Sequence, residues 1–201
     1  FNVFIGHQVA DADMTDAIQN VGIGYQSLTS LTGGESNTAI GSGSLYSLNT
    51  GNKNVAIGHL SADAITTAQY SVAIGYNALS AEVTQGTTVA IGYGALEDQN
   101  DSDSANSENV WIGYLAGAEN VTGTSNTSVG FEAMKGASGN SNSNNVAIGS
   151  KSLQDVSTGN ENTAIGSNAM LNATSSNDNV AIGYRAIGLG VLTGADNTVV
   201  G

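Results

Sequence analysis

The sequence predicts an all-β protein, a parallel β-solenoid of about twelve short coils of about 17 residues each. Three observations lead to this fold class. The motif Asn54-Val55-Ala56-Ile57-Gly58 recurs, lightly varied, along the whole chain. Its glycine returns at intervals of 17 to 21 residues, most often 17. The second and fourth motif positions are β-branched in every copy, which favours strand over helix. A fixed period of this kind is the signature of stacked structural repeats.

The glycine that ends each motif sets the register of the coils. Its copies are Gly6, Gly24, Gly41, Gly58, Gly75, Gly92, Gly113, Gly130, Gly149, Gly166, Gly183 and Gly201. The residue before it is Ile in ten copies and Val in two, and the residue three before it is Val or Thr. The isoleucines of the most regular copies are Ile57, Ile74, Ile91, Ile148, Ile165 and Ile182. Side chains alternate along a strand, so these two positions share one face. We expect that face to point into the coil, and the residue between them, usually Ala, to lie where another backbone comes close.

Asparagine occupies the position four residues before the glycine in ten copies, including Asn54, Asn145, Asn162 and Asn179. Stacked coils place equivalent side chains above one another. The amides are therefore expected to form a ladder of hydrogen bonds along the solenoid.

The rest of each coil predicts a bend, a second short strand and a turn. A small residue and then an apolar one follow the glycine, as in Ser44-Leu45, and both are expected to face inward. Several coils close with Thr-Gly, as in Thr50-Gly51, where glycine is free to adopt positive φ. Longer spacings at 97–108 and 136–145 predict surface loops. No linker divides the chain, so residues 1–201 are expected to form one repeat domain, about 53 Å long at about 4.8 Å per coil.

Composition limits the classes of function. Four Lys and Arg against 17 Asp and Glu give a net charge of −13, whereas a nucleic-acid binder needs a basic surface. Cysteine and proline are both absent, so disulfides do not hold the fold and no proline interrupts a ladder. No apolar run approaches the roughly 20 residues that cross a bilayer, so this segment is not expected to insert in a membrane. The chain begins and ends within copies of the motif, which predicts a fragment of a longer fibre protein.

The thin apolar content of each coil predicts association between chains. Many of the side chains available for burial are Ala, Val or Thr. At about 25 cal/mol per Å² of buried apolar surface, so narrow a core gains little over the entropy cost of ordering the chain. Copies packed side by side along their length would bury more apolar surface, so we expect an oligomer.

The motif as it stands in residues 71–79, Ser-Val-Ala-Ile-Gly-Tyr-Asn-Ala-Leu, and again in 179–187, resembles the head repeats of trimeric autotransporter adhesins. It resembles the repeats of bacteriophage tail fibres at least as closely, and the resemblance covers the whole chain. It implies a left-handed β-roll with three chains packed side by side as a homotrimer. The period of 17 is longer than is usual in those adhesin heads and, with the Thr-Gly closure, favours the phage repeats. The shared motif is structural, so no catalytic or cofactor-binding residue carries over.

Enzymatic chemistry finds little support. His7 and His59 both follow a motif glycine, where other copies carry Tyr or Ser, so they occupy a repeat position. Paired carboxylates can cleave a glycan. The acidic clusters are Asp11, Asp13 and Asp16, and Asp98, Asp101 and Asp103. Such clusters are usually solvated loops, so neither enzymatic activity nor a cofactor is expected.

Two further patterns are incomplete. Residues 101–106 echo a calcium loop but lack the glycine at its sixth position, so no metal site is expected. The Ile-Gly-x-x-Ala pattern fits the hexapeptide acyltransferase helix. That fold needs three such hexads per coil, and each coil here has one.

Aromatic residues after the motif glycine predict a broken stripe along one side of the solenoid. They are Tyr25, Tyr76, Tyr93, Tyr114, Phe131 and Tyr184. The stripe could pack between coils or chains, or it could bind sugar or protein, because exposed aromatic groups are good recognition groups. Trp111 with Tyr114 is the expected centre of a contact patch.

These features together favour a structural and adhesive fibre segment outside the cell, on a virion tail or a bacterial surface. It would present or contribute to receptor attachment, with a host-surface glycan or protein as partner. One alternative is a bacterial trimeric autotransporter adhesin head that binds host surface or matrix. The other is a glycan-cleaving tailspike.

Overall fold

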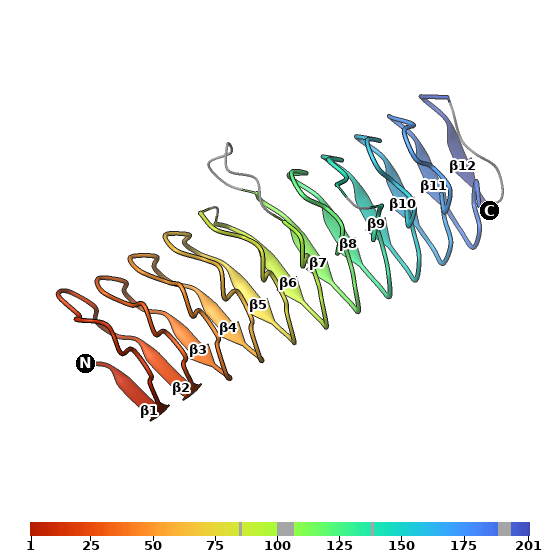
Figure 1. The fold of residues 1–201 in the computed structure, drawn as a ribbon. Helices are drawn as coiled ribbons and strands as arrows, with labels where there is room; N and C mark the ends of the chain where they lie inside the picture. Colours follow the sequence, from red (N-terminus) through yellow and green to blue (C-terminus); the bar gives the residue numbers. More distant parts are fainter. Residues whose placement is uncertain (85, 100–106, 138, 189–193) are drawn as a thin grey trace.

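The computed structural model shows an all-β chain wound as a parallel β-solenoid (Figure 1). It describes residues 1–201 except 85, 100–106, 138 and 189–193. Within the described residues, twelve strands form one sheet and follow one another in sequence order. Each coil is therefore bonded only to the coils before and after it. The predicted fold class is confirmed.

Each strand coincides with the motif. The strands are β1 (Val3–His7), β2 (Val21–Tyr25), β3 (Thr38–Ile40), β4 (Val55–Ile57), β5 (Val72–Ile74), β6 (Val89–Ile91), β7 (Val110–Ile112), β8 (Thr127–Val129), β9 (Val146–Ile148), β10 (Thr163–Ile165), β11 (Val180–Ile182) and β12 (Thr198–Val200). Equivalent residues pair directly, so that Ile57 lies opposite Ile74. This register turns every motif position into a column of side chains along the rod.

The direction of the motif side chains differs from the expectation. The middle residue of a strand faces the interior, and Ala56 and Ala147 have no exposed surface. The Val and Ile on either side point outward, and Ile57 is 37% exposed. The prediction that the Val and Ile positions face inward is wrong. The interior is already filled by apolar side chains such as Leu45 from across the coil, which leaves room for little more than a methyl group under most strands.

The segment after the glycine is buried as predicted but is not a second strand. Leu45 and Leu79 have no exposed surface, and their φ angles are 48° and 57°. Left-handed residues cannot continue a strand. The N–H of Leu45 still donates to the carbonyl of Ser61 at 3.1 Å, so the ladder between coils continues through this segment. In the parts of the coils that the structure describes, each coil therefore has one strand, followed by turns that are hydrogen-bonded to the next coil.

Two glycine positions serve different needs. The motif glycines have φ between +130° and +145°, which only glycine adopts readily. A Cβ on Gly58 would also lie 2.3 Å from the carbonyl oxygen of Gly75 in the next coil. Gly51 of the Thr-Gly closure does not have positive φ, contrary to expectation. Its Cβ would lie 2.3 Å from the carbonyl oxygen of Ala68, so close approach of the coils explains this glycine.

The predicted asparagine ladder is confirmed. The backbone N–H and side-chain Nδ2 of Asn54 donate to Oδ1 of Asn37 at 3.0 and 3.1 Å, and Nδ2 also donates to the carbonyl of Ala68 at 2.8 Å. Nδ2 of Asn162 donates to Oδ1 of Asn145 in the same way, at 3.1 Å. These side chains are buried. The asparagine ladder therefore adds hydrogen bonds between neighbouring coils directly before most of the strands, next to those of the sheet.

Candidate functional site

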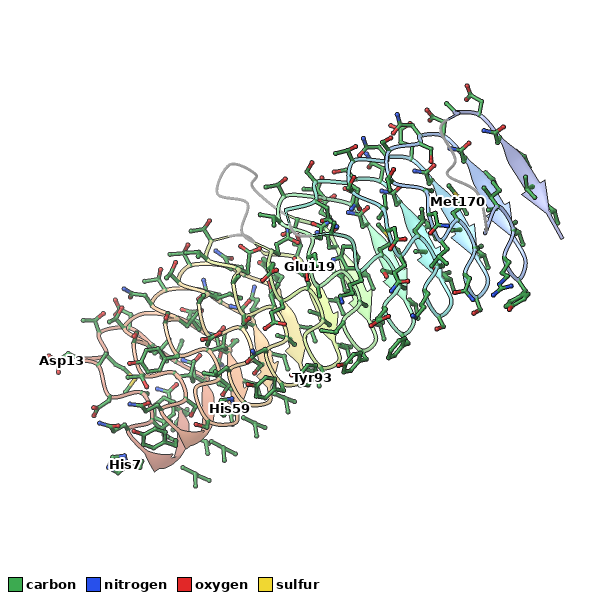
Figure 2. The ribbon with its side chains drawn as sticks, turned by 45° about the vertical axis from the view of Figure 1, so that its right-hand side comes forward. His7, Asp13, His59, Tyr93, Glu119 and Met170 are labelled. Carbon is green, nitrogen blue, oxygen red and sulfur yellow. The ribbon has the colours of Figure 1, made fainter. Side chains whose placement is uncertain are left out.

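Five consecutive coils carry a ring directly after the motif glycine, and the rings stack in one column. The members of this aromatic ladder are His59, Tyr76, Tyr93, Tyr114 and Phe131. Neighbouring ring centroids are 5.1 to 5.4 Å apart, and the planes lie within 14° of parallel. Figure 2 shows His59 and Tyr93 along the same long edge of the rod as His7. The inner rings cover one another's faces, so their outer edges are what they present to solvent.

The column is interrupted by serines. His7 stacks on Tyr25 with centroids 5.7 Å apart, and Ser42 separates this pair from His59. At the other end, two coils with serine separate Phe131 from Tyr184. The Arg185 guanidinium lies 5.3 Å from the Tyr184 ring centroid. The expected tyrosines thus lie in one column, but they fall into three groups.

Trp111 is not part of a surface patch. It is the middle residue of β7 and has no exposed surface, whereas Tyr114 is 45% exposed. Gly117 on the same coil makes room for the indole, since a Cβ there would lie 2.1 Å from Trp111 Cε3. The prediction of a Trp111–Tyr114 contact patch is wrong because the side of β7 that carries Trp111 faces the interior of the coil. The sequence carries a matching change, since glycine replaces the usual large apolar residue six positions after this large one, but that change alone does not say that the pair lies inside.

The histidines behave as members of the column. His7 stacks on Tyr25 and His59 on Tyr76. Asp63 lies near His59; partial burial raises the pKa of its carboxyl, and positive charge on His59 acts in the opposite direction. Among the described residues, no three His, Asp or Glu side chains come together in a way that could hold a metal ion.

Four of the six acidic candidates lie within the described residues. Burial raises the pKa of Asp98, and the charges of Glu119 and Glu97 raise it further. Asp101 and Asp103 lie outside the described residues. The members of the other cluster, Asp11, Asp13 and Asp16, are exposed.

A second surface feature was missed by the sequence prediction. The outward Val or Thr and Ile side chains of successive strands form two columns along the rod, which we call the Val–Ile face. Its isoleucines include Ile40, Ile57, Ile148, Ile165 and Ile182, each at least 36% exposed. No charged residue occurs at either position. The sequence shows only that a small residue lies between two larger ones, which fits one tightly packed side of the strand but does not say which side is inside.

Comparisons with protein-family models, with curated proteins and with solved structures found no match. In the part of the chain that the structure describes, no helix has the length and apolar character needed to cross a bilayer. The geometry described above leaves two candidate functional surfaces, the aromatic ladder and the Val–Ile face.

Proposed function

We propose that this chain is a non-enzymatic structural and adhesive segment of an extracellular fibre, of the kind found on phage tails or bacterial surfaces, and that it assembles as a homotrimer. The Val–Ile face carries this proposal. It is apolar, uncharged and repeated on strand after strand. Monomeric soluble proteins rarely expose an apolar surface of that extent. Other copies of the chain are its partners, because each copy offers the same face with the same spacing.

The construction of the rod suits a mechanical role. Every coil is bonded to the next through the sheet and, in most coils, through the asparagine ladder. Stacked repeats extend such a rod without changing its cross-section. The resemblance of the motif to trimeric fibre repeats supports three copies. The half-exposed rings of the aromatic ladder, beyond the glycine bend, supply a surface for attachment.

Light scattering on the purified chain tests the assembly. The expected mass is three times that of the 20.1 kDa chain. The double variant Ile91→Asp/Ile148→Asp places a carboxylate at two points of the Val–Ile face and should give monomers that retain the strand signal in circular dichroism. Tyr46→Asp is the matched control, because Tyr46 is 39% exposed but lies outside the motif. A stable wild-type monomer, or an aspartate double variant that assembles like wild type, contradicts the proposal.

A further inference from the structure

We propose that the interruption of the aromatic column at Ser42 is a binding site for one neutral pyranose ring, held between Tyr25 and His59. The inference rests on the proposed function, because it names a ligand class for the adhesive surface. It concerns a different residue column from the one proposed for assembly. Failure of one proposal can therefore be distinguished from failure of the other.

The backbone register places Ser42 directly between the two rings. The N–H of Gly43 donates to the carbonyl of Tyr25 at 2.9 Å, and the N–H of Leu60 donates to the carbonyl of Ser42 at 3.0 Å. Tyr25, Ser42 and His59 are thus equivalent residues of three successive coils. From the first coil to the eighth, Ser42 is the only residue at this position without a ring.

Both flanking rings already have a stacking partner on the side away from Ser42. His7 stacks on Tyr25, and Tyr76 stacks on His59. The remaining face of each ring borders the coil of Ser42, and the two ring-bearing coils are two strand steps apart, about 10 Å. The gap is one coil wide, so it takes one ring and no more.

The thickness of this gap favours a sugar. A ring midway between the Tyr25 and His59 rings lies about 5 Å from each. This is farther than the separation of about 3.5 to 4 Å at which carbon atoms are in contact. A pyranose chair is thicker than a planar ring, and its axial C–H groups reach toward both platforms. Aromatic faces are electron-rich and attract such C–H groups. One sugar ring would therefore contact Tyr25 and His59 at once.

The groups beside the gap are mostly polar and neutral, and one carboxylate, Asp63, lies near His59. Ser42 contributes a hydroxyl, and beside Tyr25 the Gln26 amide Nε2 donates to Gln8 Oε1 at 3.0 Å. Leu60 lies over Gly43 on the coil of Ser42, where a Cβ would meet Leu60 Cδ2 at 2.7 Å. Hydroxyl and amide groups with one apolar side chain match a neutral polyhydroxylated ring better than an ion.

The other interruption of the column lacks these properties. It is two coils wide, at Ser150 and Ser167, so one ring cannot touch aromatic platforms on both sides. It also lies beside the ion pair of Lys151 Nζ with Glu132 Oε2 at 3.3 Å. The gap at Ser42, by contrast, has an aromatic ring on the coil at each side and no ion pair beside it among the described residues.

Histidine NMR can test the site directly, because the chain has two histidines and only His59 borders the gap. The protein, labelled with ¹³C-histidine, is titrated with methyl glucoside, galactoside, mannoside and N-acetylglucosaminide, and separately with benzyl alcohol. At least one methyl pyranoside should shift the His59 ring resonances saturably, with a smaller effect at His7. Ser42→Tyr supplies the missing ring, as Tyr25 and Tyr76 do in their coils, and should abolish the shift.

Ser36→Tyr is the matched control. It adds the same side chain where the repeat carries Tyr70 two coils later, away from the gap, and should leave the His59 response unchanged. No saturable shift with any pyranoside, an undiminished shift in Ser42→Tyr, or saturation by benzyl alcohol alone overturns the proposal. Light scattering on the same samples separates this outcome from failure of the assembly proposal, because Ser42→Tyr should keep the wild-type mass.

Discussion

Trp111 and Gly117 should be replaceable as a pair by the residues that other coils carry at the same positions. In the coil of β9 that pair is Ala147 and Leu153, both without exposed surface. The backbone permits the exchange, because φ is 62° at Gly117 and 49° at Leu153. Trp111→Ala/Gly117→Leu thus rebuilds one coil on the plan of its neighbours. Each single variant breaks the match between the two volumes.

The expected magnitudes follow from burial. Trp111→Ala leaves a cavity where a fully buried indole was, at a cost of about 3–5 kcal/mol. The cost should fall toward the lower end, because Nε1 of Trp111 has no hydrogen-bond partner among the described residues and its burial is already unfavourable. Gly117→Leu overpacks the site, since even a Cβ would lie 2.1 Å from the indole, and should cost about 1–3 kcal/mol or more. The double variant should return to within about 1 kcal/mol of wild type.

The assay is urea unfolding followed by circular dichroism, because Trp111 is the only tryptophan and its fluorescence is lost in two of the variants. Solenoids can open coil by coil, so hydrogen exchange of the β7 amides should accompany it. The four proteins form a double-mutant cycle with an expected coupling on the order of 3–4 kcal/mol. A double variant as unstable as the two single effects combined would refute the volume match.

Two further predictions concern the motif glycine and a pair of carboxylates. Gly75→Ala should destabilise the rod by several kcal/mol, because φ is +139° and the new Cβ would lie 2.2 Å from the carbonyl oxygen of Gly92. Gly33→Ala is the control, because its Cβ would meet only a methyl group of Thr50 at 3.7 Å. It should be nearly neutral in the same urea titration. Glu161 and Asp178 lie on adjacent coils, and their shared hydrogen bond, followed by the Asp178 charge, raises the pKa of Glu161 in the folded protein. The folded state then binds a proton more tightly than the unfolded chain, so this pair should contribute rising stability as pH falls from neutrality through that raised pKa, levelling off below the ordinary value near 4.5. Asp178→Asn should flatten that part of the stability–pH curve relative to wild type, and an unchanged slope would count against the pairing.

The repeat could be read from the sequence because its demands are local. A motif glycine has a φ that other residues rarely adopt, and a Cβ there would collide with the next coil. An asparagine such as Asn54 bonds to the equivalent asparagine of the neighbouring coil. Both requirements return with the period, so the stacking, the register and the amide ladder were predictable. The column of tyrosines followed from the same register.

The direction of each face could not be read in the same way. Alternation shows that Val55 and Ile57 share a face opposite Ala56, but it does not say which face is inside. That choice depends on the free volume within the closed coil, where Leu45 and its equivalents already occupy the space.

The sequence by itself therefore determined a rod of stacked coils, because contacts between neighbouring coils repeat with the chain. Only the tertiary structure decided that Trp111 lies inside, that the isoleucines lie outside, and that Ser42 leaves a ring-sized break between Tyr25 and His59. Each of these depends on residues from different parts of a coil, or from different coils, competing for the same space.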